Sequence, residues 1–523
     1  MPCLPPLPPT SRLSSHFLTR YLAASPNPTV MRKSPGRVLL TNPTLTDQFT
    51  RALGIREGEV IIEGYAGVGS LTRSLVSGGD AIGEGQEWEQ TDQRVVKGGK
   101  PTGSRMTVSK KFPFPRWIDD LPALSNSSSL GPPIRKPKLV LATEGSLDIL
   151  HRGFDFPEDK RQKPVLAQTD TLSKDQEAAM SEIPEAPLVK SPHADNLFLQ
   201  HSTVYGWSVA PSLLQEPVVS AALPVWDPKA GKGQTTKRPW EAPPPPITFV
   251  ATLPDSPFGE QLLSQWVRSA VGDLGQRKSW IWEWGRVRIA LLIGKAHYDR
   301  LMAQPGDAVH NKLSIFTQAL FHTTPLPPYH HVFNVDKRAK LTESIPQNPC
   351  KYPKCDMTPH GYSPMEPRPD YLTEISNTKT VCVPTDFYPG PYSSKKPYPR
   401  PPMLGVLLTP RLHSRIPAEQ KDAWDYVLRR LFVRDTATLE QAIFNLSFGA
   451  DRLLPLIEGT QPREGGGEYR GVNVDRRRGV RYLDLDEWSR IVDVFDHWVF
   501  RPENLLTPDE GLEDETSRQI GTD

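Results

Sequence analysis

Short apolar runs that fit buried strands alternate with helical patterns along this chain, and this alternation is its strongest constraint on fold. Helical patterns include residues 48–53, 70–76 and 259–271, and the expected strands cover residues 59–63, 138–143, 196–204, 247–253, 287–293 and 403–408. Alternation of this kind is typical of a sheet covered by helices on both faces. We therefore expect a large α/β domain over residues 37–411.

The pattern changes beyond residue 415, where apolar residues recur at spacings of three and four. Further helical patterns cover residues 439–456 and 485–500, and the first helical face contains Trp424, Val427, Leu428, Leu431 and Phe432. This spacing places apolar side chains on one face of a helix. We expect a small all-helical domain over residues 415–505, followed by a tail over residues 506–523.

Proline is over-represented and clustered. The 56 prolines among 523 residues are about twice the usual share of ~5%. We interpret the clusters as disordered insertions near residues 78–138, 155–195, 224–246 and 336–402. The formal net charge is only +2, so attraction to nucleic acid has to come from local patches.

Cysteine content and hydropathy indicate the environment of the chain. Four cysteines are too few for a disulfide framework and favour a reducing compartment. No apolar run approaches the roughly 20 residues that a membrane span needs, so we expect no membrane insertion.

The N-terminal segment is free of acidic residues as far as residue 46 and carries Arg12, Arg20, Arg32, Lys33 and Arg37 among its serines. Such a segment is typical of a mitochondrial presequence. A Pro-rich tail, or a start at Met31, is the alternative interpretation. We expect a targeting segment over residues 1–36 and a location in the mitochondrial matrix, at the nucleoid.

A Gly-rich turn joins the strand at residues 59–63 to the helix that begins at Ser70. Gly67 and Gly69 permit close approach of a ligand to the backbone, and a helix N-terminus offers free N–H groups. Glu144 ends the following strand, where an acid binds ribose hydroxyls in other nucleotide-binding α/β folds. A structural turn is the alternative, but the two features in this order favour an adenosine-type cofactor.

Several segments resemble ribosomal RNA adenine dimethyltransferases, in that family's order. Residues 63–72 (Glu-Gly-Tyr-Ala-Gly-Val-Gly-Ser-Leu-Thr) resemble its first motif, and residues 37–43 its N-terminal cofactor-contact segment. Residues 286–292, 300–306 (Arg-Leu-Met-Ala-Gln-Pro-Gly) and 313–315 are similar to the stretch after its catalytic motif. Residues 431–439 resemble the entry to its helical domain, and residues 497–502 the closing segment of fungal mitochondrial members. The resemblance covers residues 37–75, 138–150, 196–333 and 403–502.

This resemblance implies a class I S-adenosylmethionine-dependent methyltransferase fold, which is Rossmann-like, followed by the helical domain. Two of the implied cofactor positions depart from the family pattern. Tyr65 stands at its first glycine, and Thr203 stands where an acid usually recognises the adenine of the cofactor. We therefore expect S-adenosyl-L-methionine to be a vestigial cofactor. The implied cofactor-binding residues are Asn42, Glu63, Tyr65, Gly67, Gly69, Glu144 and Thr203.

The motif that reads the target base departs further. Methylating members carry Asn or Asp, an apolar residue, Pro and an aromatic, and this chain has Thr252-Leu253-Pro254-Asp255. A hydroxyl replaces the amide that orients the adenine amino group, and a carboxylate replaces the ring that stacks on the flipped base. Base stacking is worth about 1–3 kcal/mol, so we expect methyl transfer to be weak or lost.

Members of the mitochondrial transcription-factor branch hold single-stranded DNA in a basic cleft, which implies cationic positions here. The candidates are Arg286, Arg288, Arg429, Arg430, Arg476, Arg477 and Arg478, with a solvated surface as the alternative for each. The family's usual Arg-Arg-Lys run stands as Arg434-Asp435-Thr436, which argues against a grip on structured ribosomal RNA. The expected partners of this monomer are mitochondrial RNA polymerase and promoter DNA, with ribosomal RNA as the alternative.

Two other groups of residues receive structural interpretations. Cys350, Cys355, His360 and Cys382 have loose spacing in a Pro-rich context, so we expect no metal site. Trp280, Trp282 and Trp284 are expected to pack in a core rather than to stack on bases.

The resulting hypothesis is a mitochondrial transcription initiation factor that assists promoter opening. The alternatives are an active ribosomal RNA adenine N6-dimethyltransferase of the mitochondrial small subunit and an RNA-binding assembly factor without chemistry.

Overall fold

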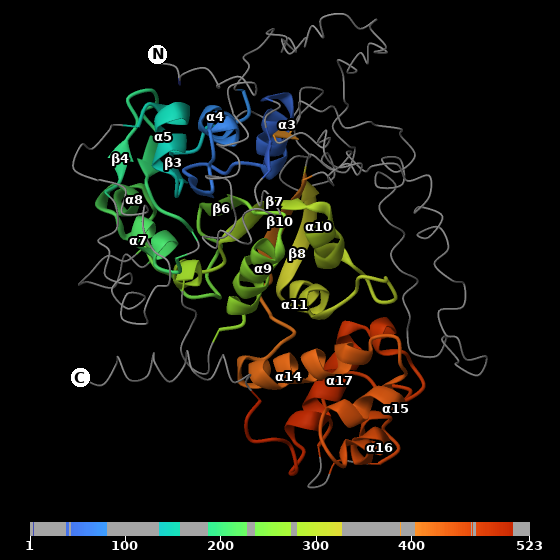
Figure 1. Ribbon diagram of the computed structural model, residues 1–523. Helices are drawn as coiled ribbons and strands as arrows, with labels where there is room; N and C mark the ends of the chain where they lie inside the picture. The colour runs from blue at the N-terminus through green and yellow to red at the C-terminus, as the bar shows by residue number, and fades with distance from the viewer. Residues whose placement is uncertain are drawn as a thin grey trace, which may run out of the picture.

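The computed structural model describes residues 4, 38–40, 43–80, 135–156, 187–204, 206–226, 236–272, 280–326, 387–388, 403–461, 463 and 467–505. An α/β part lies above a group of short helices in the view of Figure 1. The expected targeting segment lies outside these ranges apart from Leu4. The expected tail, Asn42 and the residues Cys350, Cys355, His360 and Cys382 also lie outside the described residues.

An eight-stranded sheet forms the centre of the α/β part, with strand order β4-β5-β3-β2-β6-β7-β10-β8. The strands β5 (Leu197–Gln200), β3 (Leu139–Thr143), β2 (Val60–Gly64), β6 (Ile247–Thr252) and β7 (Arg288–Gly294) run parallel. The order reverses between β2 and β6, and ligands of such sheets bind beyond the carboxyl ends of the strands at that reversal. The Gly-rich turn follows β2 directly.

The other edge of the sheet is antiparallel. Strand β10 (Met403–Pro410) inserts between β7 and β8 (Phe321–Leu326) and runs antiparallel to both. A short β4 (Val189–Lys190) pairs antiparallel with β5, and β1 (Leu39–Leu40) pairs with β9 (Phe387–Tyr388) in a separate two-stranded sheet. Together with the helical part that follows, this architecture confirms the expected methyltransferase-type α/β fold.

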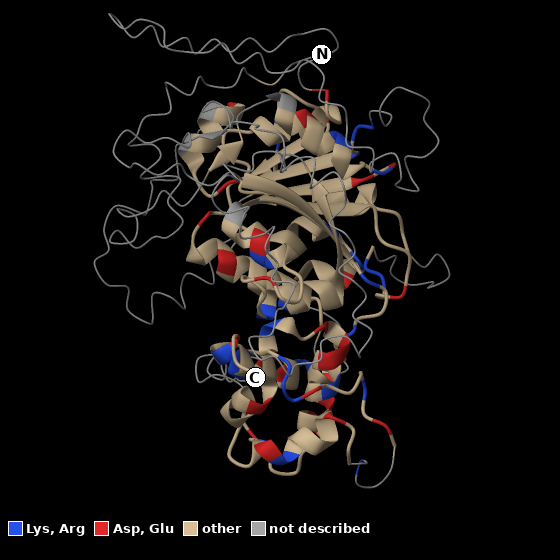
Figure 2. Cartoon of the chain, turned by 90° about the vertical axis from the view of Figure 1, so that its right-hand side faces the viewer, with Lys and Arg blue, Asp and Glu red and all other residues tan. Residues whose placement is uncertain are grey.

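Helices cover both faces of the sheet because its strands alternate apolar side chains between two cores. In β2, Ile61 belongs to one core, and Val60 and Ile62 belong to the other. Helices α3 (Pro43–Leu53), α4 (Ser70–Ser77) and α5 (Leu147–Phe154) pack on the first face. Helices α7 (Val209–Gln215), α8 (Pro217–Ala222), α9 (Pro257–Ser269), α10 (Lys295–Met302) and α11 (Lys312–Leu320) pack on the second. Figure 2 shows the sheet between these layers.

The tryptophan cluster lies in this second core, as expected. Trp280 and Trp284 begin and end the short 3-10 helix η4 (Trp280–Trp284). Trp280 stacks on Trp266 with ring centroids 5.4 Å apart and contacts Phe249 edge-on. All three tryptophans of η4 are buried, so they stabilise the fold and offer no platform to a base.

The C-terminal part is helical but more broken than its sequence indicates. It contains η5 (Ala418–Gln420), α14 (Lys421–Leu431), η6 (Phe432–Arg434), α15 (Leu439–Ala442), η7 (Ile443–Asn445), η8 (Ala450–Leu453), α16 (Leu454–Ile457), η9 (Val480–Tyr482) and α17 (Leu485–Asp496). The single helix expected over residues 439–456 is wrong. Gly449 adopts φ 79° and Pro455 lacks an N–H, so short turns replace a continuous helix.

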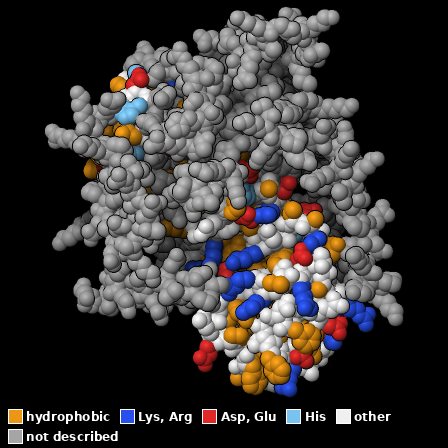
Figure 3. All heavy atoms as spheres, in the orientation of Figure 1, with side chains coloured by type: hydrophobic (Ala, Val, Ile, Leu, Met, Phe, Trp, Pro, Cys, Tyr) orange, Lys and Arg blue, Asp and Glu red, His pale blue; other side chains and the backbone are white. Residues whose placement is uncertain are grey.

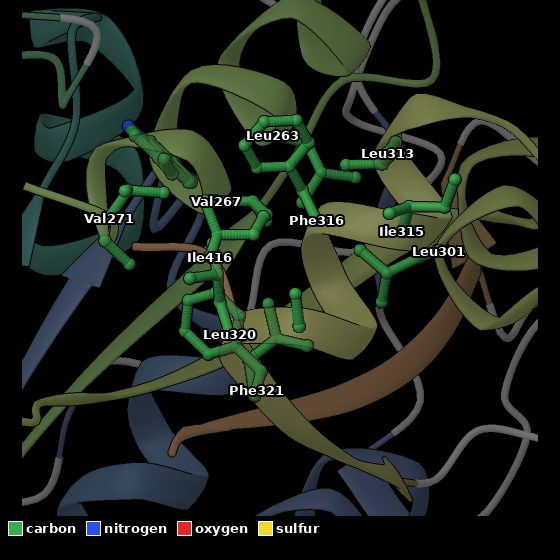
Figure 4. Packing of buried hydrophobic residues seen from close by; sticks show 14 of the residues in the cluster. Leu263, Val267, Val271, Leu301, Leu313, Ile315, Phe316, Leu320, Phe321 and Ile416 are labelled. Atoms are coloured by element: carbon green, nitrogen blue, oxygen red, sulfur yellow. The ribbon is translucent and has the colours of Figure 1, made fainter. Parts of the chain in front are cut away.

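A continuous apolar core joins the two parts. Figure 4 shows Ile416, which follows the last strand, among side chains of α9, α11 and β8. The same cluster continues through Trp424 of α14 to Trp488 of α17. At the edge of the core, Lys312 of α11 forms an ion pair with the buried Asp425, and Arg268 of α9 lies 3.4 Å from the same carboxylate.

Some elements lie where the sequence analysis expected insertions or strand. β4 and β9 fall within the expected insertions at 155–195 and 336–402, and the buried Trp240 falls within that at 224–246. The strand expected over 196–204 ends at Gln200. Among the residues described, no helix combines the length and apolarity that crossing a membrane requires.

Candidate cofactor and target-base site

The Gly-rich turn keeps the backbone path of a cofactor loop. Tyr65 adopts φ 59°, Gly67 61° and Gly69 79°. The left-handed region costs a residue with a side chain roughly 1–2 kcal/mol, which explains a family glycine at the position that Tyr65 occupies. The side chain of Tyr65 is buried in the core beneath the turn.

Glu144 lies beside the turn, and the protein's own backbone satisfies its carboxylate. Gly67 donates its N–H to Oε2 at 2.9 Å, and Ser146 donates its N–H to Oε1 at 3.2 Å. Glu144 is only 1% exposed. A ribose would have to displace Gly67 or Ser146 to use this acid.

Glu63 is the second buried acid of the site. Burial, with a smaller contribution from the charge of Glu144, raises its pKa to about 8 although Thr72 and Arg73 oppose the rise. Its Oε2 atom is buried without a hydrogen-bond partner. Glu63 is therefore protonated and neutral at pH 7.

Side chains of the protein fill the space around the glycines of the turn. A methyl group added at Gly67 would lie 2.6 Å from Leu39, and one added at Gly64 would lie 2.6 Å from Val204. The ring of Phe154 from α5 lies against Gly69. Close approach of a ligand is the usual reason for glycine in such a loop, but here the approaching groups belong to the protein.

Arg73 closes the turn from the side of α4. Its guanidinium donates to the carbonyls of Val68 at 2.9 Å, of Gly69 at 2.8 Å and of Gly153 at 2.8 Å. Burial lowers its pKa to about 10, so it stays charged at neutral pH. Sequence reasoning missed Arg73 because nothing in its neighbourhood indicates a partner 80 positions away in the chain.

The residues present therefore do not fit an adenosine cofactor in this conformation. Glu63, Gly67, Glu144 and Thr203 are brought to one edge of the sheet as expected, with Thr203 against Gly145. However, Glu144 is already bonded to the backbone, and Glu63 is neutral. Protein side chains occupy the surroundings of the turn, namely those of Leu39, Phe154, Val204 and Arg73.

Cofactor binding tests this interpretation directly. We expect titration calorimetry with S-adenosylhomocysteine to give no saturable heat, with a dissociation constant weaker than about 1 mM. The melting temperature should also stay unchanged, because only a ligand that binds the folded state raises it. A cofactor-binding methyltransferase serves as the positive control. Saturable binding with a raised melting temperature would show that the turn opens.

The target-base motif lies next to this turn, at the end of β6. Gly64 of β2 pairs with Ala251, and Thr252 follows it as the last residue of the strand. Leu253 donates its N–H to the carbonyl of Leu292 at 2.9 Å, which fixes the position of the motif on the sheet. Leu253 and Pro254 are buried, so neither offers a surface to a base.

Asp255, the last residue of the predicted target-base motif, faces protein groups. Its carboxylate lies against the backbone of Gly294, and its Oδ1 lies 3.9 Å from Nδ1 of His297. His297 also lies 3.9 Å from Glu260, which pairs with Arg300. Burial lowers the pKa of His297 although both carboxylates raise it. Sequence reasoning missed this histidine, whose position three residues after the end of β7 was its only signal.

Two of the predicted nucleic-acid contacts are engaged by groups of the protein itself. Arg288 forms an ion pair with Glu59 at 2.8 Å and donates to the carbonyl of Leu53 at 3.1 Å. Arg286 donates to the carbonyls of Trp240 and Ala242, each at 3.0 Å. Both side chains anchor the amino ends of strands, whereas the Gly-rich turn lies at the carboxyl ends.

The arginine run of the helical part is mostly engaged as well. Arg478 is buried beside Glu487, with the two side chains 3.3 Å apart. Arg476 pairs with Glu458. Arg477 is exposed. The run therefore presents Arg477 and the paired but 38% exposed side chain of Arg476 to solvent, and it buries Arg478.

Arg429 and Arg430 occupy the last turn of α14. Arg429 donates to the carbonyl of Leu505 at 2.8 Å. Arg430 is exposed, and its guanidinium lies 5.2 Å from the ring centroid of Tyr426. Of the predicted contacts, Arg430, Arg476 and Arg477 keep a solvent-facing position.

The segment at residues 300–306, the most distinctive part of the resemblance, connects the two parts of the protein. Gly306 has φ 94° and donates its N–H to the carbonyl of Arg481 at 2.9 Å. His310 donates from Nδ1 to the same carbonyl at 2.9 Å, and its ring contacts Phe432 edge-on. Burial lowers the pKa of His310 to about 4.

Within the described part of the chain, no group of side chains suited to a metal ion is present.

Two solved structures align with this chain, both with low overlap. Among solved structures, a dimethyladenosine transferase from Plasmodium falciparum aligns with a TM-score of 0.35 and 12% identity, covering 87% of this chain and 95% of that one. The 23S rRNA methyltransferase ErmE aligns with a TM-score of 0.36 and 9% identity, covering 88% of this chain and 100% of that one. No curated protein matches. These overlaps are too low to carry an argument, and the fold rests on the strand order.

A match to a family model covers the target-base motif, the segment at residues 300–306 and the first half of the helical part, as far as α16. The Gly-rich turn and Glu144 lie outside this match, which spans less than half of the chain. Residues 239–461 match the family described as ribosomal RNA adenine dimethylase, and in this region the chain is similar to that family.

Proposed function

We propose that this protein is a mitochondrial transcription initiation factor, built on an adenine dimethyltransferase fold, that helps mitochondrial RNA polymerase to open promoters. The observation that carries the proposal is the altered target-base motif. Thr252 supplies a hydroxyl where an amide is needed, and Asp255 supplies an anion where a ring is needed. Loss of positioning costs orders of magnitude in rate when the nucleophile is poor.

The state of the cofactor turn supports the loss of chemistry. Glu144 is bonded to the backbone of the turn, and Arg73 and Phe154 cover its outer side. Cofactor binding and target-base recognition are therefore both impaired, at neighbouring positions on the sheet. A fold kept without its chemistry is expected to serve through binding. The acid-free, arginine-bearing N-terminal segment supports a mitochondrial location.

Promoter opening tests the proposal. We expect the purified protein to increase transcript initiation by the matching mitochondrial polymerase on a closed linear promoter. A template with a pre-melted bubble over the start site is the matched control, and stimulation should largely disappear on it because the strands are already apart. Fluorescence of 2-aminopurine within the start site should rise only when protein and polymerase are both present.

Methylation is the competing activity. Labelled S-adenosylmethionine and a hairpin of small-subunit ribosomal RNA should yield no dimethyladenosine. Dimethyladenosine formation would overturn the proposal in favour of an active dimethyltransferase. Failure to stimulate initiation, together with tight binding of the hairpin, would favour an RNA-binding assembly factor.

A further inference from the structure

The helical part exposes aromatic side chains that no described element covers. Phe448 is 100% exposed, Phe500 70% and Phe444 60%, whereas a folded chain normally buries most of the surface of such rings. Trp498 is half-buried beside them. We call Phe444, Phe448, Trp498 and Phe500 the aromatic patch. Figure 3 shows hydrophobic side chains gathered on the lower end of the helical part, with Lys and Arg side chains over the same face.

The aromatic patch is one surface, although its residues come from two segments. The ring of Trp498 lies 4.0 Å from the point that a Cβ atom at Gly449 would occupy, and Gly449 directly follows Phe448. The ring of Trp498 also meets that of Phe500 edge-on, with centroids 6.3 Å apart.

The base of the patch is rigid. Tyr426 of α14 stacks on Phe495 of α17 with ring centroids 5.4 Å apart, and Phe495 contacts Trp498. The Tyr426 hydroxyl donates to the carbonyl of Leu446 at 2.5 Å, which ties the loop between Phe444 and Phe448 to α14. The exposed rings therefore project from a fixed support and lose little conformational freedom when a ligand binds.

Cationic side chains are interleaved with these rings. Arg430 lies at the edge of the patch, because Asn445 donates to its carbonyl at 3.5 Å, and Arg452 follows Phe448 by one turn. Both arginines are exposed, and neither forms an ion pair with another described residue. Asp451 precedes Arg452 in the chain, and Asp496 pairs with Arg501.

Rings that alternate with exposed guanidinium groups suit a single nucleic-acid strand better than a protein surface. The core of a protein–protein interface is a continuous apolar area from which charge is largely excluded. A single strand presents bases and phosphates in alternation, and any base can stack on an exposed ring. The guanidinium of Arg430, which already lies over an aromatic ring, can contact a phosphate and a base plane.

We propose that the aromatic patch binds single-stranded nucleic acid, with bases stacked on Phe448 and Phe500 and phosphates neutralised by Arg430 and Arg452. The proposal rests on the proposed function, since an opened promoter supplies single strands. It locates the binding surface in the helical part, away from the altered target-base motif.

Fluorescence anisotropy with a labelled 20-nucleotide oligothymidine tests the proposal on the full chain. We expect the double variant Phe448→Ala/Phe500→Ala to bind roughly tenfold or more weakly than the wild type, because each stack contributes about tenfold or more. Trp226→Ala is the matched control, since it removes an exposed ring beside Arg238 in the α/β part. Both variants alter exposed side chains, so their melting temperatures should match that of the wild type.

Salt dependence separates the roles of rings and cations. Arg430→Gln should reduce the slope of log affinity against log salt by about 0.7, whereas Phe448→Ala/Phe500→Ala should leave this slope unchanged. A 20-base-pair duplex should show no dependence on the two rings, because its bases are already stacked. An equal loss for duplex and single strand would overturn the stacking role.

Unchanged oligothymidine binding by the double variant would overturn the proposal. Concentration-dependent self-association that disappears in the double variant, without oligothymidine binding, would assign the patch to a protein interface instead. Both results leave the promoter-opening assay free to succeed or fail with wild-type protein. Failure of the patch is thus distinguishable from failure of the proposed function.

Discussion

Replacing Arg288 with alanine is expected to lower the free energy of unfolding by about 3–5 kcal/mol, because it leaves a carboxylate buried without its main partner. Glu59 is 0% exposed, and the Arg288 side chain, which is 13% exposed, covers it. Arg288 also donates to the carbonyls of Leu53 and Gly54 and to the hydroxyl of Thr248. Chemical denaturation at pH 7 measures the change.

Two further variants separate a structural role from a surface one. Arg477→Ala, which alters an exposed arginine, should change stability by no more than about 0.5 kcal/mol. Glu59→Leu/Arg288→Met should recover only part of the loss, since an apolar pair removes this ion pair from the core but leaves Arg56 without its partner Glu59. Retained stability in Arg288→Ala would contradict the buried pair and reopen a role for Arg288 in binding phosphates.

The pH dependence of the same pair has a definite sign. Burial alone raises the pKa of Glu59, but the charges of Arg288 and Arg56 and the hydrogen bond from Thr248 outweigh it, so the pKa lies below its ordinary value. An acid with a depressed pKa stabilises the fold at pH values above its unfolded pKa, and this stability is lost as pH falls through the folded pKa. The contribution should therefore be complete at neutral pH and disappear in acid.

Glu63→Gln should stabilise the protein in alkaline solution, and this is the second large effect. The folded pKa of Glu63 is about 8, against 4.5 for an ordinary glutamate. The folded state therefore binds more protons than the unfolded state between these two values, and stability falls as pH rises through this window. Between pH 5 and pH 9 the wild type should lose roughly 3–5 kcal/mol relative to the variant.

Urea denaturation at pH 5, 7 and 9 measures this difference. At pH 5 the two proteins should differ little, because the carboxyl group and the amide are both neutral. Glu57→Gln is the matched control, since Glu57 is exposed on the turn just before β2, and it should follow the wild type at every pH. Parallel curves for wild type and Glu63→Gln would show that Glu63 is ionised in the folded protein.

The sheet could be predicted from the sequence because its strands are continuous apolar runs. The run expected at residues 247–253 forms β6 over Ile247–Thr252, and that expected at residues 403–408 forms β10 over Met403–Pro410. Strands buried on both faces have this composition wherever they lie in the chain. Helix α5 was missed because its eight residues follow Gly145 and are too short for a helical period to stand out.

The site could be predicted only in part. Glu63 lies in β2, Glu144 directly follows β3, and Gly67 and Gly69 lie in the turn between β2 and α4, so each position could be read from the strand pattern. The rest of the site depends on contacts between residues that lie far apart in the sequence. Arg288 meets Glu59 across 229 positions, and no local pattern distinguishes such an arginine from one that faces solvent.

The apolar core that runs from Val267 through Ile416 to Trp488 removes the hinge that a two-domain clamp would need. Rotation of the helical part against the sheet would break this core and expose its aromatic rings to water. Heat should therefore unfold both parts in one cooperative step. A strand of nucleic acid would bind a surface whose shape is the same before and after binding. Any adjustment to a bound strand would have to come from individual side chains, since the shared apolar core holds the two parts in one arrangement.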